Sequence, residues 1–515
     1  MRPWLLAMLF GCNNVHLATP DDVVACLADH RCVRGQRIEN VDAFRGIPYA
    51  APPVGPLRWK PPAPASWTGT RDALAFGKAC PQLDDTIGGK LETDEDCLTL
   101  NVWTPDVHPR APRPVMVWIH GGGLVQGGTA LPFYDGHVLA GQGDVVVVSL
   151  AYRLGPLGFL AHPAFSAEDA HHSSGDFGLL DQIAALHWVH DHAAAFGGDP
   201  AKVTIFGESA GGESVCALMA SPLAAGLFER AVIESAQCPA PGKAARLLRD
   251  ASAGESAEQQ GLRIAHLLGC DGAAAASCLR AKSVDQLLHA SPAAFGFLGK
   301  GEHYGVVIDG HVLPEAPASA LAAGHLARVP VVIGTNADEA TLFTARMPLR
   351  RDAGYDYLVR KIFPDDADAV LAAYPATGSP KQAFDRLVTD AVFACPTRRF
   401  ARALRGRQPV FQYEFAHATA KLRARGLGAM HGSEIPFVFA DGADFTAGEQ
   451  QLSRTMLGYW AQFAHTGDPD RTGSPVWPAS DPGDAYLELD LSISARTNLH
   501  GAGCDVLDHA RIAEN

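Results

Sequence analysis

The chain has 515 residues, of which 47% are hydrophobic and 19% are charged, and its formal net charge is −14. This composition is typical of a folded globular protein with a sizeable core, and it excludes a largely disordered chain. The negative charge repels phosphate backbones and anionic lipid headgroups. No run of Lys or Arg, zinc-ligand spacing or interleaving of aromatic and basic residues offsets that charge, so we expect no nucleic-acid partner.

The N-terminus contains a short apolar run, residues 4–10, which follows Arg2 and precedes Cys12. Two interpretations stay open: a secretory or lipoprotein leader over residues 1–20, or an ordinary frayed start. The run is too short to span a bilayer, and no other stretch is long and apolar enough to be transmembrane. No linker divides the remainder, so we expect residues 21–515 to form a single domain with long insertions.

Eleven cysteines occur, and none of them forms a C-x-x-C pair. The close pairs Cys26 with Cys32 and Cys270 with Cys278 are more typical of small disulfide loops than of metal sites. We therefore predict no bound metal. We also expect an oxidising compartment, with the protein secreted or periplasmic.

Apolar runs alternate with helical stretches along much of the chain, after a first hundred residues of short strands and loops. The expected buried strands are residues 114–119, 144–150, 202–206, 230–233 and 329–333, and the expected helices are residues 181–194 and 212–219. This alternation predicts an α/β fold in which helices cover both faces of a mostly parallel sheet. Residues 345–465 are expected to be mainly helical, and the C-terminal end is expected to be loop with a short strand at 485–490.

The segment Gly207-Glu208-Ser209-Ala210-Gly211 matches the pattern G-x-S-x-G, and it lies between a predicted strand and a predicted helix. In enzymes with an open α/β sheet, this pattern places a nucleophilic serine on a tight turn. The flanking glycines leave room for the chain to reverse direction without a Cβ clash. We therefore interpret Ser209 as a nucleophile rather than as part of a structural glycine turn.

A second glycine-rich segment, His120-Gly121-Gly122-Gly123, follows the strand predicted at 114–119. Consecutive glycines allow backbone N–H groups to point into a site and to stabilise a developing oxyanion. Such a segment on its own would be interpreted as a flexible loop. Together with the turn at Ser209 it predicts an oxyanion hole, with the N–H of Ala210 as a further donor.

The candidate base is His431, which lies in a glycine-containing turn after both the serine and a candidate acid. That acid is Asp338 or Glu339, and both follow the strand predicted to end at Ile333, where α/β sheets place functional groups. The order serine, acid, histidine is that of the α/β-hydrolase triad. Competing histidines occur at His187, His190, His192 and His465.

The chain resembles the type B carboxylesterases, a family that includes cholinesterases, liver carboxylesterases and bacterial esterases of the para-nitrobenzyl kind. Residues 44–50 and 52–59 resemble the family's opening signature, residues 95–103 its second signature, and residues 206–212 its nucleophile motif. The match covers nearly the whole chain. It implies an α/β-hydrolase fold and a serine carboxylic-ester hydrolase that needs no cofactor and acts on a small-molecule ester.

The resemblance also implies roles for individual residues. It selects Glu339 over Asp338 as the acid that orients His431. The other implied groups are an oxyanion hole of Gly122, Gly123 and Ala210, and a buried polar set near the histidine of Glu208, Ser235 and Glu434. The implied disulfides are Cys80–Cys97, Cys270–Cys278 and Cys395–Cys504, which leaves Cys12, Cys26, Cys32, Cys216 and Cys238 unassigned.

Three positions depart from the family pattern. Leu124 replaces the aromatic residue expected after the glycines, and Ala236 and Ala340 each replace a glycine. These changes are expected to alter the shape of the acyl pocket and to leave the chemistry in place.

Two alternative functions follow from the same resemblance. A cholinesterase carries a tryptophan in its first disulfide loop to hold a choline cation, but the loop between Cys80 and Cys97 contains no aromatic residue. A non-catalytic adhesion protein of this fold would have lost members of the triad, and this chain keeps Ser209, Glu339 and His431. Both alternatives are therefore less favoured than an esterase.

The substrate stays open among small to medium esters, including bulky or xenobiotic ones. Phe295, Phe297, His303 and Tyr304 lie near the place where the family has acyl-pocket residues, although ordinary loop and core positions explain them equally well. Lys300 and His303 would suit a pocket that accepts anionic esters.

Overall fold

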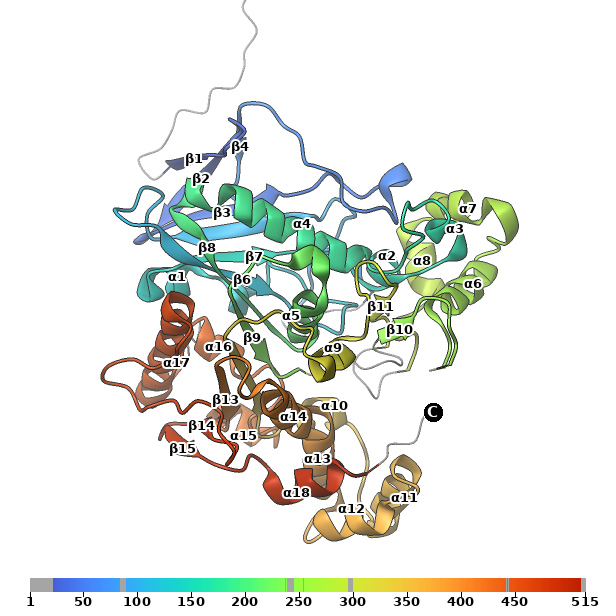
Figure 1. Ribbon diagram of the computed structural model, residues 1–515, viewed down its shortest axis with the longest axis vertical. Helices are drawn as coiled ribbons and strands as arrows, with labels where there is room; N and C mark the ends of the chain where they lie inside the picture. The colour runs from blue at the N-terminus through green and yellow to red at the C-terminus, as the bar shows by residue number, and fades with distance from the viewer. Residues whose placement is uncertain are drawn as a thin grey trace, which may run out of the picture.

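A thirteen-stranded sheet forms the centre of the molecule (Figure 1). The computed structural model describes residues 22–83, 89–236, 238, 245–252, 254–294, 300–440, 442 and 444–510. The possible leader over residues 1–20, and Phe295 and Phe297 of the expected acyl pocket, lie outside the described residues.

The strands of the sheet follow the order β1-β2-β3-β5-β7-β6-β8-β9-β12-β13-β14-β15, and β4 pairs with β2. Their bounds are β1 Asp22–Cys26, β2 Cys32–Ile38, β3 Val41–Pro48, β4 Thr70–Asp72, β5 Thr99–Thr104, β6 Arg113–Ile119, β7 Val146–Leu150, β8 Gly198–Glu208, β9 Arg230–Glu234, β12 Val331–Asn336, β13 Val410–Phe415, β14 Tyr486–Leu489 and β15 Ser494–Arg496. The strands from β7 to β14 are all parallel, and antiparallel strands extend the sheet at both ends. A separate parallel pair joins β10 Ala245–Leu247 to β11 Val306–Ile308.

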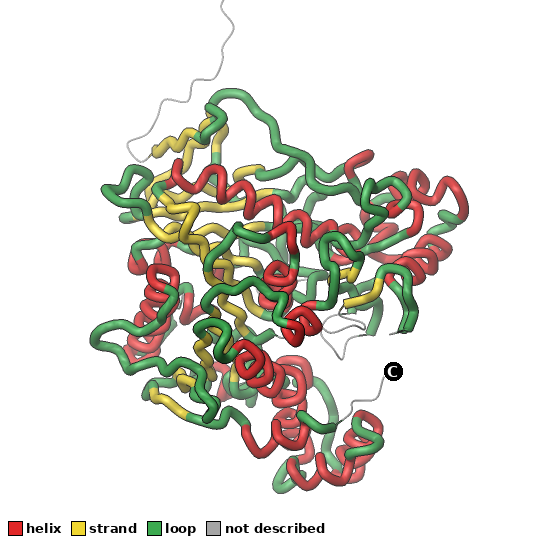
Figure 2. Tube along the Cα trace, in the orientation of Figure 1, coloured by secondary structure: helices red, strands yellow, loops and turns green. Residues whose placement is uncertain are grey.

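Helices flank the strands (Figure 2). Their bounds are α1 His137–Gly143, α2 Gly155–Phe159, α3 Pro163–Ser166, α4 Phe177–His192, α5 Ala210–Ala220, α6 Ala257–Leu267, α7 Ala275–Ala281, α8 Val284–Ala290, α9 Pro317–Ala323, α10 Thr341–Thr344, α11 Asp352–Ile362, α12 Ala367–Ala373, α13 Pro380–Thr389, α14 Cys395–Leu404, α15 Ala420–Ala424, α16 Ile435–Val438, α17 Ala447–Thr466 and α18 Gly501–Leu507. A π-helical turn, η6 (Asp390–Ala394), joins α13 to α14. Among the described residues, no helix is long and apolar enough to cross a membrane.

Strand β6 shows how the sheet divides the core. Val117 and Ile119 belong to a cluster that includes residues of α4 and α5, whereas Met116 and Trp118 belong to a second cluster with residues of α1 and α17. Successive side chains of a strand point to opposite faces, so a strand that is apolar throughout requires cover on both sides. This arrangement confirms the predicted α/β fold.

A third cluster lies outside the sheet, among α11, α12, α13 and α18 at the lower end of the view in Figure 1. Tyr355 of α11 and Phe384 of α13 are among its largest buried side chains. The disulfide between Cys395 and Cys504 lies within the cluster and links α14 to α18.

Five disulfides are present among the described residues. Three are those that the family resemblance implies: Cys80–Cys97, Cys270–Cys278 and Cys395–Cys504. The other two are Cys26–Cys32, a close pair that the sequence already favoured as a small disulfide loop, and Cys216–Cys238, for which the sequence indicated no pairing. Cys216 lies on α5, the helix that follows the candidate nucleophile, and Cys238 lies in the loop after β9. This last bond therefore links α5 to that loop. Five such bonds fit an oxidising compartment.

The structure adds elements to those expected in the C-terminal third. The region expected to be mainly helical contains β13, a strand between β12 and β14 whose six residues are all buried. The end of the chain, expected to hold a single short strand, contains β14, β15 and the helix α18. The region is otherwise mainly helical and β14 lies where the short strand was expected, so both predictions are incomplete rather than wrong. The missed strands are short segments with little local periodicity, and pairing with neighbouring strands decides their conformation.

Candidate active site

Ser209 occupies the sharp turn between β8 and α5. Its backbone has φ 56° and ψ −126°, a region that non-glycine residues rarely adopt, and its N–H donates to the carbonyl oxygen of Glu234 at 2.9 Å. A Cβ on Gly211 would lie 2.0 Å from the carbonyl oxygen of Ile119, so only glycine allows α5 to pack this close to β6. The glycine pattern predicted from the sequence therefore forms a strained turn that presents the Ser209 side chain beyond the end of β8.

His431 is held by Glu339. The Nδ1–H of His431 donates to Oε2 of Glu339 at 2.6 Å, and both side chains are buried. The other carboxylate oxygen of Glu339 accepts from the Thr335 hydroxyl at 2.9 Å and from the Asn336 N–H at 2.7 Å. Because Nδ1 carries the hydrogen, Nε2 is the nitrogen available to act as a base.

Asp338, the other candidate acid, has a different place. Its Oδ2 accepts from the backbone N–H of Ala429 at 2.9 Å, and its own N–H donates to the Ala429 carbonyl at 3.0 Å. Asp338 therefore anchors the segment that leads to His431 and does not bind the imidazole itself.

The glycine segment after β6 borders the same site. Gly122 and Gly123 have φ values of 107° and 65°, which favour glycine. The N–H groups of Gly122, Gly123 and Ala210 have no hydrogen-bond acceptor among the described residues. Unpaired N–H groups that line a cavity beside a serine can bind an oxyanion.

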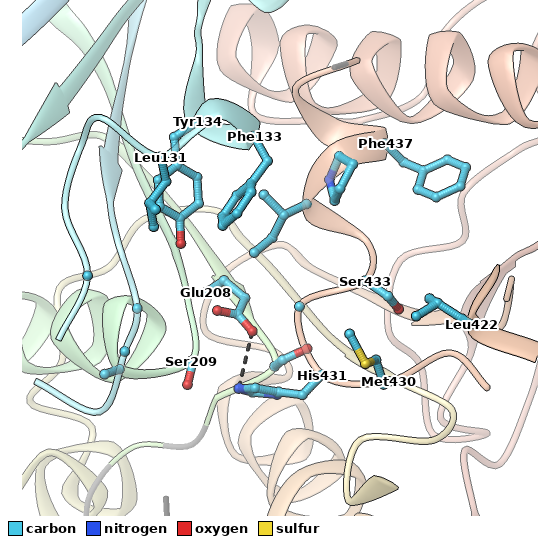
Figure 3. Close-up of a pocket in the computed structure, with 18 of the residues that line it drawn as sticks. Leu131, Phe133, Tyr134, Glu208, Ser209, Leu422, Met430, His431, Ser433 and Phe437 are labelled. Carbon is cyan, nitrogen blue, oxygen red and sulfur yellow. Dashed lines mark ion pairs between the residues drawn. The ribbon is translucent and has the colours of Figure 1, made fainter. Parts of the chain in front are cut away.

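Buried carboxyl groups surround the histidine. Glu208 has its Oε1 3.2 Å from Nε2 of His431, and no described side chain makes a hydrogen bond with that nitrogen (Figure 3). Glu434 accepts from the Ser235 hydroxyl at 3.2 Å and from the Asn336 side-chain amide. The expected polar set of Glu208, Ser235 and Glu434 therefore lies together beside His431.

These contacts shift the pKa values of His431 and of the carboxyl groups beside it. Burial raises the pKa of Glu208 to about 8 and that of Glu434 to about 7, and neighbouring carboxyl groups add to the rise while His431 opposes it. Burial alone would lower the pKa of His431, but the nearby carboxylates of Glu208 and Glu339 raise it to about 9. These shifts all keep the two carboxyl groups and His431 more protonated than they would be in water.

Two aromatic rings hold His431 from its other sides. The ring centroids of Phe343 and Phe393 each lie 5.0 Å from the imidazole centroid. Phe393 belongs to the π-helical turn η6, and π-helical turns are frequent at functional sites. Neither ring was singled out from the sequence, because only the fold brings residues 343 and 393 next to residue 431.

A cavity of about 910 Å³ opens in front of Ser209 and His431. In Figure 3, Leu131, Phe133 and Tyr134 form one wall, and Phe437 lies on the opposite side. The cavity is lined by apolar side chains together with a few polar groups, as small-molecule sites usually are.

The structure places only some of the residues proposed for the acyl pocket at the cavity. His303 and Tyr304 line the cavity, whereas Lys300 is described but is not among its lining residues. Two cations that the sequence did not single out, Lys421 and Arg425, line it instead. Leu124, one of the departures from the family pattern, is buried with φ 60° at the back of the glycine segment and does not line the cavity.

The carboxylesterase family model matches residues 30–507, nearly the whole chain. The chain belongs to the carboxylesterase family. Among the relatives of this carboxylesterase, the cocaine esterase of Homo sapiens is 37% identical over 495 residues, covering 88% of this chain and 84% of that protein. Fumonisin B1 esterase of Sphingopyxis macrogoltabida is 38% identical over 462 residues, covering 85% of this chain and 81% of that protein. A solved PNB esterase structure superposes with a TM-score of 0.80 at 34% identity, covering 94% of this chain and 99% of that chain.

Proposed function

We propose that this carboxylesterase hydrolyses its ester through an acyl-enzyme formed on Ser209, with His431 as base and Glu339 as the supporting acid. The observation that carries the proposal is the buried 2.6 Å hydrogen bond from His431 to Glu339, beside a serine held on a strained turn. A carboxylate alone does not make a serine nucleophilic at neutral pH, so the intervening imidazole is required.

The steps follow from these positions. Nε2 of His431 takes the proton of the Ser209 hydroxyl as the oxygen attacks the ester carbonyl, and Glu339 stabilises the imidazolium that forms. The N–H groups of Gly122, Gly123 and Ala210 bind the oxyanion of the tetrahedral intermediate. The imidazolium then protonates the leaving alcohol, and a water activated by His431 hydrolyses the acyl-enzyme.

In the resting structure Nε2 of His431 makes no hydrogen bond with a described side chain and has Glu208 as its acidic neighbour. Catalytic hydrogen bonds are often long or misaligned before substrate binds. Substrate in the cavity would exclude water and bring the Ser209 hydroxyl and the imidazole into line.

The size and lining of the cavity support a small to medium, and even bulky, ester as substrate. A volume of about 910 Å³ exceeds what a short-chain ester needs. The names of the two relatives, cocaine esterase and fumonisin B1 esterase, refer to bulky esters. A non-catalytic adhesion role is the weaker alternative, because such a role gives no reason to keep Ser209, Glu339 and His431 together.

The five disulfides support a secreted or periplasmic location, where such bonds persist. We take residues 21–515 as one catalytic domain, a proposal supported by the single family model that matches residues 30–507.

Initial rates on 4-nitrophenyl esters from acetate to laurate, for the wild type and Ser209→Ala, test the proposal. We expect turnover by the wild type and a loss on the order of 10⁶-fold in kcat for Ser209→Ala. An organophosphonate should label the wild type at Ser209 and leave the variant unlabelled. Equal rates in the two proteins, or labelling at another residue, would assign the chemistry elsewhere.

A further inference from the structure

The short helix α15 carries a cluster of positive charge at the substrate cavity. Lys421 lies on α15 and Arg425 directly follows it, and both side chains line the cavity that contains Ser209 and His431. A third cation of this segment, Arg423, does not line the cavity. All three cations are exposed, but only Lys421 and Arg425 can reach a molecule bound in the cavity.

Lys421 and Arg425 have no ion-pair or hydrogen-bond partner for their side chains within the described part of the chain. Many other arginines do bind carboxylates, as in the buried pair of Arg153 with Asp181. In a chain with a net charge of −14, acidic partners are plentiful. The two unpaired cations at the cavity are therefore available to bind a ligand.

The acidic residues that line the same cavity neutralise this pair only in part. Glu449 is occupied, since its carboxylate accepts from the Thr446 hydroxyl and N–H at 2.7 Å each and from the His417 ring at 3.1 Å. Asp444 lines the cavity, is exposed and has no partner among the described residues, so it opposes the two cations in part.

Deeper in the cavity lie the carboxyl groups of Glu208 and Glu213. Burial raises the pKa of Glu208 to about 8 and that of Glu213 to about 7, so both groups carry reduced negative charge near neutral pH. With the charge of these two carboxyl groups reduced, the charges that remain near α15 favour a bound anion.

We propose that Lys421 and Arg425 bind a carboxylate carried by the ester substrate itself, so that the enzyme prefers esters with a free carboxylate to neutral esters of the same length. This proposal rests on the proposed hydrolysis at Ser209. An ammonium and a guanidinium form charge-assisted hydrogen bonds with a carboxylate, and the planar guanidinium matches its geometry. Both cations are exposed to water, so salt weakens the preference.

The test compares two esters that differ in one charge, mono-(4-nitrophenyl) suberate and 4-nitrophenyl octanoate. The measured quantity is the ratio of kcat/KM for the anionic ester to kcat/KM for the neutral ester. We expect this ratio to fall about threefold in Lys421→Gln or Arg425→Gln and about tenfold in the double variant, as for partly exposed charge pairs. Added salt should lower the wild-type ratio and leave the ratio of the double variant nearly constant.

Two further variants make the test specific. Arg423→Gln removes the same charge from the same segment but from outside the cavity, and its ratio should equal that of the wild type. Asp444→Asn removes the opposing charge, and its ratio should rise. A ratio that is unchanged in the double variant, or that falls equally in Arg423→Gln, would overturn the proposal.

A binding measurement separates this proposal from the proposed catalysis. In the Ser209→Ala background, calorimetric titration with intact mono-(4-nitrophenyl) suberate should show weaker binding once Lys421 and Arg425 are both replaced by Gln. If the wild type hydrolyses neither ester but this difference in binding is present, the cation site stands and the catalytic assignment fails. If both esters are hydrolysed and binding does not differ, the reverse holds.

Discussion

Oε1 of Glu208 lies 3.2 Å from Nε2 of His431, the nitrogen that the proposed mechanism assigns to the Ser209 proton. The carboxyl that approaches the base therefore belongs to the residue directly before the nucleophile in the chain. This closeness makes the charge of Glu208 a determinant of the pH at which His431 is a free base.

Replacing Glu208 by Gln should move the rising part of the pH profile of kcat/KM to lower pH. The carboxylates around His431 raise its pKa to about 9, so loss of one of them lowers that pKa and frees the base at lower pH. The profile is measured with a neutral 4-nitrophenyl ester. The exposed Asp444→Asn variant is the control and should leave the position of the profile nearly unchanged, because water screens its charge. An unshifted profile in Glu208→Gln would contradict this coupling.

Glu339→Gln and Asp338→Asn should separate the two candidate acids. Glu339 accepts the His431 Nδ1–H at 2.6 Å, so its amide variant leaves the imidazole poorly oriented and in part in the wrong tautomer. We expect kcat to fall by roughly 10²- to 10⁴-fold, less than for Ser209→Ala. Asp338→Asn keeps an acceptor for the Ala429 N–H and should cost far less. If the larger loss occurs in Asp338→Asn, the acid has been misassigned.

Removal of the Cys216–Cys238 disulfide by paired Cys→Ala substitutions should lower the thermal unfolding midpoint. The bond spans 22 residues, for which the loss of chain entropy in the unfolded state corresponds to about 3 kcal/mol of stability. The Cys395–Cys504 bond spans 109 residues, and its removal should cost more, about 5 kcal/mol. The midpoints of the two double variants are compared by scanning calorimetry. A smaller loss for the longer loop would count against this entropic account.

His500→Gln should lower stability in a pH-dependent way. His500 lies between Asp390, in the turn η6, and Glu414, on β13, and hydrogen bonds with these carboxylates outweigh burial and raise its pKa to about 10. Since the folded protein holds this proton more tightly than the unfolded chain, the stabilisation is complete below the ordinary histidine pKa of 6.5 and is lost as the pH rises through about 10.

The measurement for His500 is the thermal midpoint of the wild type and of His500→Gln as a function of pH. The gap between the two proteins should be largest at mildly acidic pH and should close towards alkaline pH. The exposed His108→Gln variant is the control and should follow the wild type throughout. A gap that widens with rising pH would mean that His500 is bound in its neutral form.

The sequence predicted more of the central sheet than of the C-terminal third. The strands β6, β7, β8, β9 and β12 were expected because each is a continuous apolar run that must be buried on both faces. Strand β13 was missed, although its residues are equally buried, because it mixes Val410 and Phe411 with Gln412 and Glu414. Its conformation comes from pairing with β12 and β14, which no local pattern encodes.

The candidate site shows the same contrast between residues found from local patterns and residues found only in the structure. Ser209 and His431 could be named because the glycine turn and the order of serine, acid and histidine are local features of the chain, whereas the choice of Glu339 over Asp338 came from the family resemblance. The contacts of Phe343 and Phe393 with His431, and the position of Lys421 and Arg425 at the cavity, involve residues far apart in sequence. They were not found because proximity between such residues is a property of packing.

By itself the sequence determined the local chemistry: a serine on a glycine turn, unpaired N–H groups in a glycine segment, and a histidine downstream of an acid. The tertiary structure decided which of these groups meet. Strands β8 and β12 both pair in parallel with β9, so Ser209 and Glu339 emerge at the same edge of the sheet. Strand β13 extends that edge, and the chain after it brings His431 back to Glu339 and Lys421 to the cavity. Side-by-side parallel pairing, which joins residues up to 100 positions apart, such as Ala231 and Val331, is what converts the local motifs into one site.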